Sequence, residues 1–218
     1  MAAGAYASNN FSQQRRSRQQ LRSERTHALR LDDAAVTDDS LIERTVMGTY
    51  SISPDGKLAI AASQSSSQHD FDFLLGGWKI RNRKLKEPLA RCDEWTEFDA
   101  SQHCHQILQG FGDYDIFSAE FDGKPFEGFT LRLFDPETRL WTLYWADSSA
   151  AKLDGGKVGS FDGDIGEFFA REVFAGKDVI VRFHWDKRDP NAPVWSAAFS
   201  GDNGHTWEWN WYAYFERR

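Results

Sequence analysis

Two carboxyl groups, those of Glu127 and Asp147, are the first candidates for acid–base chemistry. They flank a turn at 135–138, in segments where apolar and polar residues alternate. The register that pairs Leu133 with Trp141 across this turn also places Glu127 opposite Asp147. Two carboxyl groups can act as acid and base when burial raises the pKa of one of them. At the rim of a barrel both would be solvated, and the sequence leaves both interpretations open.

A second acidic face lies on the segment 91–98, where Asp93, Trp95 and Glu97 recur at every second position. Residues with this spacing point to the same side of a strand. An enzyme would need such ionisable groups inside an apolar site. The direction of this face therefore bears on whether the protein is an enzyme.

The sequence His103-Cys104-His105 is a candidate for metal binding, because His103 and His105 share one face of a strand. Zinc and copper sites need at least a third protein ligand. A hairpin with 91–98 would place Thr96 and Phe98 opposite the histidines, and neither is a usual ligand. We therefore predict no metal and keep the two histidines as candidates only.

Aromatic residues dominate one face of the expected sheet. The register across 135–138 pairs Phe129 with Trp145, and a turn at 189–192 pairs Trp185 with Trp195. Continuing through the turn at 201–204, Trp207, Trp209 and Trp211 share the inward direction. Apolar walls are typical of small-molecule sites, but aromatic side chains also fill many cores. The candidate ligand-binding residues on this face are Phe129, Leu131, Trp141, Trp145, Phe183, Trp185 and Trp209.

Short alternating segments separated by turn residues predict the elements that position these side chains. Their regular spacing is typical of an all-β sandwich or barrel, and tight turns make sequential strands antiparallel. A single bulky inner face favours a closed barrel. We predict an antiparallel up-and-down β-barrel of about ten strands. The expected segments are 77–85, 91–98, 103–109, 113–122, 126–134, 139–147, 156–162, 165–174, 178–186, 193–200 and 206–217.

The chain divides near residue 68, because residues 1–68 hold three aromatic residues and no tryptophan. We predict an N-terminal extension over 1–68, partly disordered, and a barrel domain over 69–218. The extension contains an arginine-rich stretch at 12–30, which could be a solvated tail, a frayed helix or a transit peptide. A small hairpin is expected at 49–60, followed by a flexible polar linker at 63–68.

Composition excludes several classes of protein. The net charge of −7 argues against a nucleic-acid partner. No apolar run reaches 18 residues, so we expect no transmembrane helix. Cys92 and Cys104 do not lie opposite one another in the expected register, so we expect no disulfide. Met1 is not followed by the apolar stretch of a secretory signal, which predicts a cytoplasmic protein.

Gly76-Gly77-Trp78 in the first strand and Arg217 in the last resemble the calycin closure, in which a basic residue stacks on the tryptophan of strand one. Other blocks extend the resemblance to a bacterial lipocalin-like family of unknown function. They are His69-Asp70-Phe71-Asp72-Phe73-Leu74, the segment 128–141 and the segment 195–211. The resemblance covers about 69–217 and implies a lipocalin-like barrel closed by Trp78 and Arg217. It implies no activity.

The block at 69–74 is expected to form a short helical turn that plugs one barrel end with Phe71, Phe73 and Leu74. A His69–Asp70 pair is the alternative, catalytic interpretation. Nitrobindin, a related ten-stranded barrel, binds haem through a histidine of its late strands. Residues 206–217 contain no histidine, and His184 has outward parity. We therefore predict no cofactor.

These observations predict a soluble carrier or sensor of a small hydrophobic or aromatic molecule held in the barrel interior. The alternative is an enzyme using acid–base chemistry there, as an isomerase, cyclase or hydrolase. A third hypothesis is an interaction module that makes contacts through the arginine-rich extension. We predict no nucleic-acid or membrane partner, and the extension is a candidate for contacts between copies of the chain.

Overall fold

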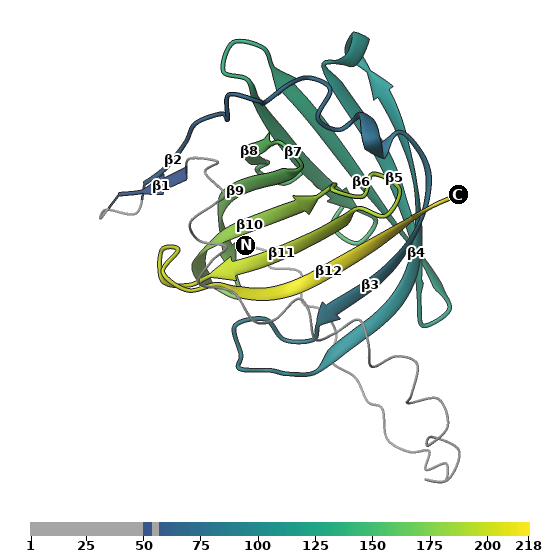
Figure 1. The fold of residues 1–218 in the computed structure, drawn as a ribbon. Coiled ribbons are helices and arrows are strands. Elements are labelled where there is room, and N and C mark those ends of the chain that lie inside the picture. The colour runs from purple at the N-terminus through teal and green to yellow at the C-terminus, as the bar shows by residue number, and fades with distance from the viewer. Residues whose placement is uncertain (1–49, 54–56) are drawn as a thin grey trace, which may run out of the picture. The chain divides into compact units, whose positions relative to one another are not determined.

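The computed structural model describes residues 50–53 and 57–218, in which ten antiparallel strands close into a barrel (Figure 1). Each strand pairs with its neighbours in sequence, and β12 pairs with β3 to close the ring. The predicted fold class is confirmed. The strands are β3 Gly76–Leu85, β4 Trp95–Ile107, β5 Gly112–Phe121, β6 Lys124–Asp135, β7 Leu140–Asp147, β8 Lys157–Asp162, β9 Ile165–Phe174, β10 Lys177–Asp186, β11 Val194–Ser200 and β12 Glu208–Arg217.

Tight turns with positive backbone φ join several of these strands. Asp122 and Gly123, between β5 and β6, have φ of 52° and 73°. Ala175 and Gly176, between β9 and β10, have φ of 49° and 78°. Two successive residues of positive φ are the signature of a type I′ turn, whose twist matches that of antiparallel strands. These turns make up-and-down order the natural outcome.

The register predicted across 189–192 is confirmed, whereas that predicted across 135–138 is wrong by one residue. Trp185 pairs with Trp195 as predicted. Across the other turn, Phe134 pairs with Trp141 and Arg132 pairs with Leu143. A slip of one residue reverses the face of every side chain on a strand. On β6 the inward positions are therefore the even-numbered ones, including the buried Arg132.

The region predicted as two strands, at 91–98 and 103–109, is the single strand β4. It pairs with β3 on one side and β5 on the other, so that Gly77 and Ile116 flank His103. The predicted hairpin that placed Thr96 and Phe98 opposite the histidines is wrong. Alternation continues through the polar stretch at 99–103, and no turn residue interrupts it.

A β-bulge interrupts the pairing of β11 with β12. Ala197 pairs with Trp211 and Ala198 pairs with Trp209, which leaves Asn210 as the extra residue. A bulge of this kind reverses the inside–outside alternation of the strand. The prediction that Trp207 and Trp209 point inward with Trp211 is therefore wrong.

One end of the barrel is closed by a short 3-10 helix, η1, at Asp72–Leu74. Phe71 and Leu74 are fully buried, and Phe73 packs against the same core. The indole nitrogen of Trp78 donates to the carbonyl of Leu74 at 2.7 Å. The predicted plug is confirmed, and we call this end the plug end and the opposite one the far end.

A small hairpin precedes the plug, with β1 at Tyr50–Ile52 and β2 at Leu58–Ile60, inside the predicted range 49–60. Residues 63–67 then follow the outside of the plug end. Ser66 Oγ donates to the carbonyl of Arg139 at 2.7 Å, and Trp141 Nε1 donates to the carbonyl of Ser67 at 3.1 Å. Residues 63–67, predicted as part of a flexible polar linker, are thus hydrogen-bonded to the barrel.

The arginine-rich stretch at 12–30 lies outside the described residues. Among the residues described, no helix is both long enough and apolar enough to cross a membrane.

Candidate functional site

Side chains fill the plug end of the barrel interior. The Phe71 ring lies 5.0 Å from those of Trp141 and Phe161 and 6.1 Å from that of Trp185, measured between centroids. Trp141 and Trp185 are both at most 4% exposed. Both point inward as predicted, but here they form the core beneath the plug. A ligand that enters the barrel is thereby restricted to the far end.

At the far end, aromatic side chains point inward yet are only half-buried, and we call them the ring cluster. Trp211 lies 5.5 Å from Trp195, which lies 4.9 Å from Phe183. Trp145 lies on the opposite wall, with its indole packed over Gly128. A Cβ at position 128 would lie 2.0 Å from the indole, so this packing requires glycine. The ring cluster consists of Phe98, Phe126, Trp145, Phe183, Trp195 and Trp211.

Two lysines that are not exposed, Lys84 and Lys157, lie against the ring cluster. Lys157 forms ion pairs with Asp154 and, at 2.7 Å, with Glu172, and its ammonium lies over the Phe183 ring. Lys84 shares the inward direction of Trp78 on β3, and its ammonium lies 3.9 Å from the centroid of the Trp211 indole. Burial lowers the pKa of Lys84, and the distant charge of Asp147 only partly offsets this.

The two carboxyl groups predicted as an acid–base pair do not lie opposite one another. Asp147 pairs with Gly128, and Glu127 is exposed. Partial burial opposes the charge of Asp147, but hydrogen bonds from Ser149, Ala150 and the Trp145 indole hold its pKa below the ordinary value. Asp147 is thus an ionised group that orders the start of the loop after β7.

Three predicted ligand-binding residues lie on the outer face. Phe129 and Leu131 alternate with the buried Arg132, and Phe129 lies 6.0 Å from Tyr114 on the outer side of β5. Trp209 lies under the Arg182 guanidinium, 5.3 Å from it. Trp145 and Phe183 are the predicted ligand-binding residues that the structure brings to the far end.

His103 and His105 also lie on the outer face, with rings stacked 4.5 Å apart. His105 stacks in turn on Tyr114 at 5.3 Å, so the histidines belong to an outer aromatic row. Over the described part of the chain, no group of three or more histidine, cysteine or acidic side chains is placed to hold a metal ion.

The acidic face of the predicted segment 91–98 also points outward. Glu97 pairs with Arg81 at 3.0 Å, and both are exposed. Trp95 lies beneath the Arg83 guanidinium, 4.6 Å from it, and Asp93 is exposed. These groups do not reach the interior.

His69 and Asp70 do not form the alternative catalytic pair. His69 Nδ1 lies 2.9 Å from Asp72 Oδ2, and both side chains are exposed. Asp70 is buried, and its carboxylate accepts from the amide of Ser67 at 2.9 Å. Burial raises the pKa of Asp70, against that hydrogen bond and the charge of Lys187. Asp70 therefore has a structural role in holding the plug.

Sequence reasoning missed a buried ionic cluster beneath the plug. Arg132 Nε donates to Asp113 and its NH2 group donates to Asp115, both at 2.5 Å. Burial raises the pKa of both carboxyl groups, and the charge of the one guanidinium that they share offsets this only in part. Burial also raises the pKa of the neighbouring Cys104 thiol to about 12. The sequence shows Asp113 and Asp115 two positions apart, on one face of a strand. The predicted register across 135–138 was wrong by one residue, however, and placed Arg132 on the outer face.

His184 points outward, as predicted. Its Nδ1 lies 2.5 Å from Glu167, which also accepts two hydrogen bonds from Arg182. Burial opposes the charge of Glu167, but these partners lower its pKa. His184 therefore belongs to an outer cluster with Glu167 and Arg182 and is not directed at the interior.

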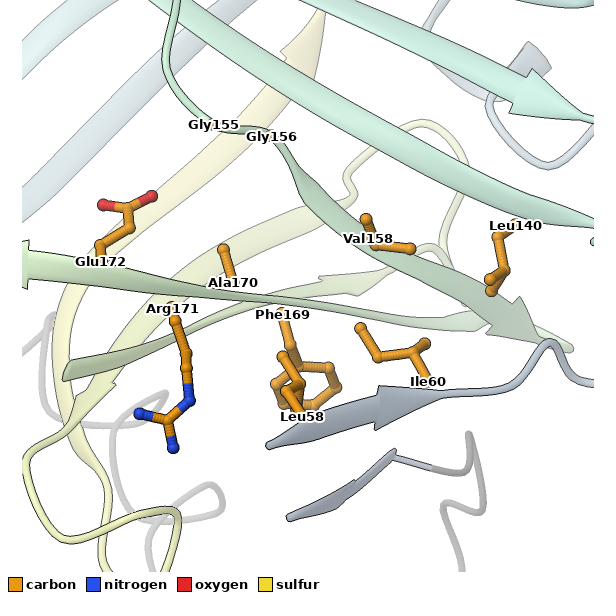
Figure 2. Close-up of a pocket in the computed structure, with 10 residues that line it drawn as sticks. All are labelled: Leu58, Ile60, Leu140, Gly155, Gly156, Val158, Phe169, Ala170, Arg171 and Glu172. Carbon is orange, nitrogen blue, oxygen red and sulfur yellow. The ribbon is translucent and has the colours of Figure 1, made fainter. Parts of the chain in front are cut away.

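A hollow of about 430 Å³ lies outside the barrel, between the hairpin and strands β8 and β9 (Figure 2). Leu58 and Ile60 of β2 line one side, and Val158 and Phe169 line the other. Tyr50 closes against the Phe169 ring at 4.1 Å. The hairpin thus packs by apolar contacts on the outer wall.

No family model matches this chain, and no curated protein matches it.

Proposed function

We propose that the protein binds a small aromatic or apolar molecule at the far end of the barrel. The observation that carries this proposal is the contrast between the two ends. Phe71, Trp78, Trp141, Phe161, Phe168 and Trp185, which form the core beneath the plug, are buried, whereas the inward-facing rings of the ring cluster remain half-buried. Soluble proteins usually cover such apolar surface, and apolar walls with a few polar groups are typical of ligand sites.

The ring cluster suits a flat ligand. Trp195 meets Trp211 at 79° and Phe183 at 76°, so these three rings present edges and faces in alternation along the wall. A planar ligand can stack on one ring while meeting the edge of the next, and each such contact contributes about 0.5–1.5 kcal/mol beyond area burial.

We do not propose the alternative acid–base enzyme. Glu127 is exposed and does not lie opposite Asp147, and hydrogen bonds hold the pKa of Asp147 below its ordinary value, whereas a general acid needs a raised one. Membership of the lipocalin-like family, supported by the Trp78–Arg217 closure, is also proposed. The predicted partners and cytoplasmic location stay predictions.

Fluorescence titration with N-phenyl-1-naphthylamine, an uncharged aromatic probe, tests the proposal. We expect saturable binding of one probe per chain. Trp145→Leu and Trp211→Leu should each weaken binding by about 2- to 10-fold, from the loss of one stacking contact. Trp209→Leu, on the outer face, is the matched control and should leave binding unchanged. Equal effects of all three variants, or no saturable binding, would overturn the proposal.

A further inference from the structure

Lys84 is a cation to which the described part of the chain supplies no counter-ion within ion-pair distance. In the range 57–218, its ammonium has the Trp211 ring as its contact, and neither a hydrogen bond nor an ion pair involves it. Lys157, whose ammonium lies over the Phe183 ring, instead forms ion pairs with Asp154 and Glu172. Among the residues that the structure describes, Lys84 thus places a positive charge without an ion-pair partner against the ring cluster, where it is available to a ligand.

Its surroundings compensate the charge only in part. Trp211 pairs with Lys84 on the neighbouring strand and donates its own indole N–H to Asn82 at 3.0 Å, so the ring presents its face to the ammonium. Asp147 acts on Lys84 only through space, and its oxygens already accept hydrogen bonds from Trp145 and the following loop. A buried charge with this little compensation is costly unless a partner of opposite sign binds.

We propose that the far-end site takes an organic anion, an aromatic molecule whose single acid group pairs with the Lys84 ammonium while its rings lie against the ring cluster. This inference rests on the proposed function and specifies its ligand class. The acid group would complete the polar contacts that the protein leaves open at Lys84. A charge-assisted hydrogen bond in a partly desolvated site is worth about 10- to 100-fold in affinity.

Two probes that share a ring system separate the charge from the rings. N-phenyl-1-naphthylamine is neutral, and 1-anilinonaphthalene-8-sulfonate adds one sulfonate. Both are titrated against the full chain and against Lys84→Met, Lys84→Arg and Lys79→Met. Lys79 lies on the same strand as Lys84 but is exposed on the outer face, so Lys79→Met is the matched control.

We expect Lys84→Met to weaken binding of the sulfonate about 10- to 100-fold and to change binding of the neutral probe by less than about 3-fold. Lys84→Arg, which keeps the charge, should retain most of the preference for the sulfonate. Lys79→Met should alter neither affinity. Should Lys84→Met fail to fold by circular dichroism, Lys84→Gln takes its place in the same comparison.

The outcomes separate the two proposals. Equal weakening of both probes by Lys84→Met would mean that Lys84 only packs against the ligand, and unchanged sulfonate binding would mean that it binds no anion. Either result overturns the inference while the proposed function stands. Failure of both probes to bind the wild-type chain saturably overturns the proposed function and the inference together.

Discussion

The guanidinium of Arg217 lies over the indole of Trp78, with its central carbon 3.9 Å from the ring centroid. The same guanidinium donates to the carbonyls of Leu75 and Phe73 at 2.6 and 2.8 Å, so it joins the last strand to the plug. Since β12 pairs with β3 at this point, one contact fastens both the ring of strands and its end.

Removing either partner of this closure should destabilise the fold. Arg217→Ala is expected to cost about 1–3 kcal/mol, because it removes the cation–π contact and leaves carbonyls unpaired. Trp78→Ala should cost about 3–5 kcal/mol from the cavity it leaves. The double variant should cost less than the sum, because residues in contact are coupled. Urea unfolding of the four proteins measures this, and strict additivity would contradict it.

The ionic cluster beneath the plug should depend on its single cation. Arg132→Met leaves Asp113 and Asp115 buried without a positive partner, which is expected to cost about 3–5 kcal/mol of unfolding free energy. Arg81→Met removes an exposed ion pair with Glu97 and serves as the control, with little change expected. Chemical denaturation compares the two, and an Arg132→Met protein as stable as the control would refute this role.

The same cluster predicts how stability depends on pH. Burial raises the pKa of Asp113 and Asp115 above the ordinary value of 3.8. As pH rises past that value, the unfolded chain releases these protons before the folded one does, so this contribution to stability falls. Asp115→Asn removes one acid and leaves Asp113 paired one-to-one with Arg132. The variant should therefore gain stability relative to wild type as the pH rises past 3.8. A difference that stays constant with pH would contradict the assignment.

The serines before the plug should contribute to barrel stability. A chain beginning at residue 69 lacks the hydrogen bonds of Ser63 to Ser160, of Ser66 to Arg139 and of Trp141 to Ser67. At about 0.5–1.5 kcal/mol each, their loss should lower the melting temperature relative to a chain beginning at residue 61. Calorimetry of both chains tests this, and equal melting temperatures would place the domain boundary at 69 as predicted from composition.

The features that the sequence predicted well are those fixed by local signals. At the turn after β10, the carboxylate of Asp189 accepts from the amide of Asn191 and its carbonyl accepts from Ala192, so the turn residues set the register. The plug and closure follow from Phe71, Trp78 and Arg217, whose types suit the burial and stacking that the structure gives them.

The remaining errors have local causes that hydrophobicity does not reveal. Arg139 has φ of 58° and donates its amide to Asp135, so it belongs to the turn, and the register shifts by one residue. Apolar Phe129 and Leu131 then face outward and Arg132 faces inward, the reverse of the usual preference. Near the far end, Asn210 forms the bulge that turns Trp209 outward. Predicting which residues form the ring cluster requires both the register across 135–139 and the bulge at Asn210, and the sequence pattern shows neither.

The most direct test of the account is to locate a bound ligand by nuclear Overhauser effects in the complex with N-phenyl-1-naphthylamine. We expect cross-peaks from probe protons to the indole protons of Trp145, Trp195 and Trp211. Cross-peaks confined to Trp207 and Trp209 would place the ligand on the outer wall and contradict a binding site at the far end of the barrel.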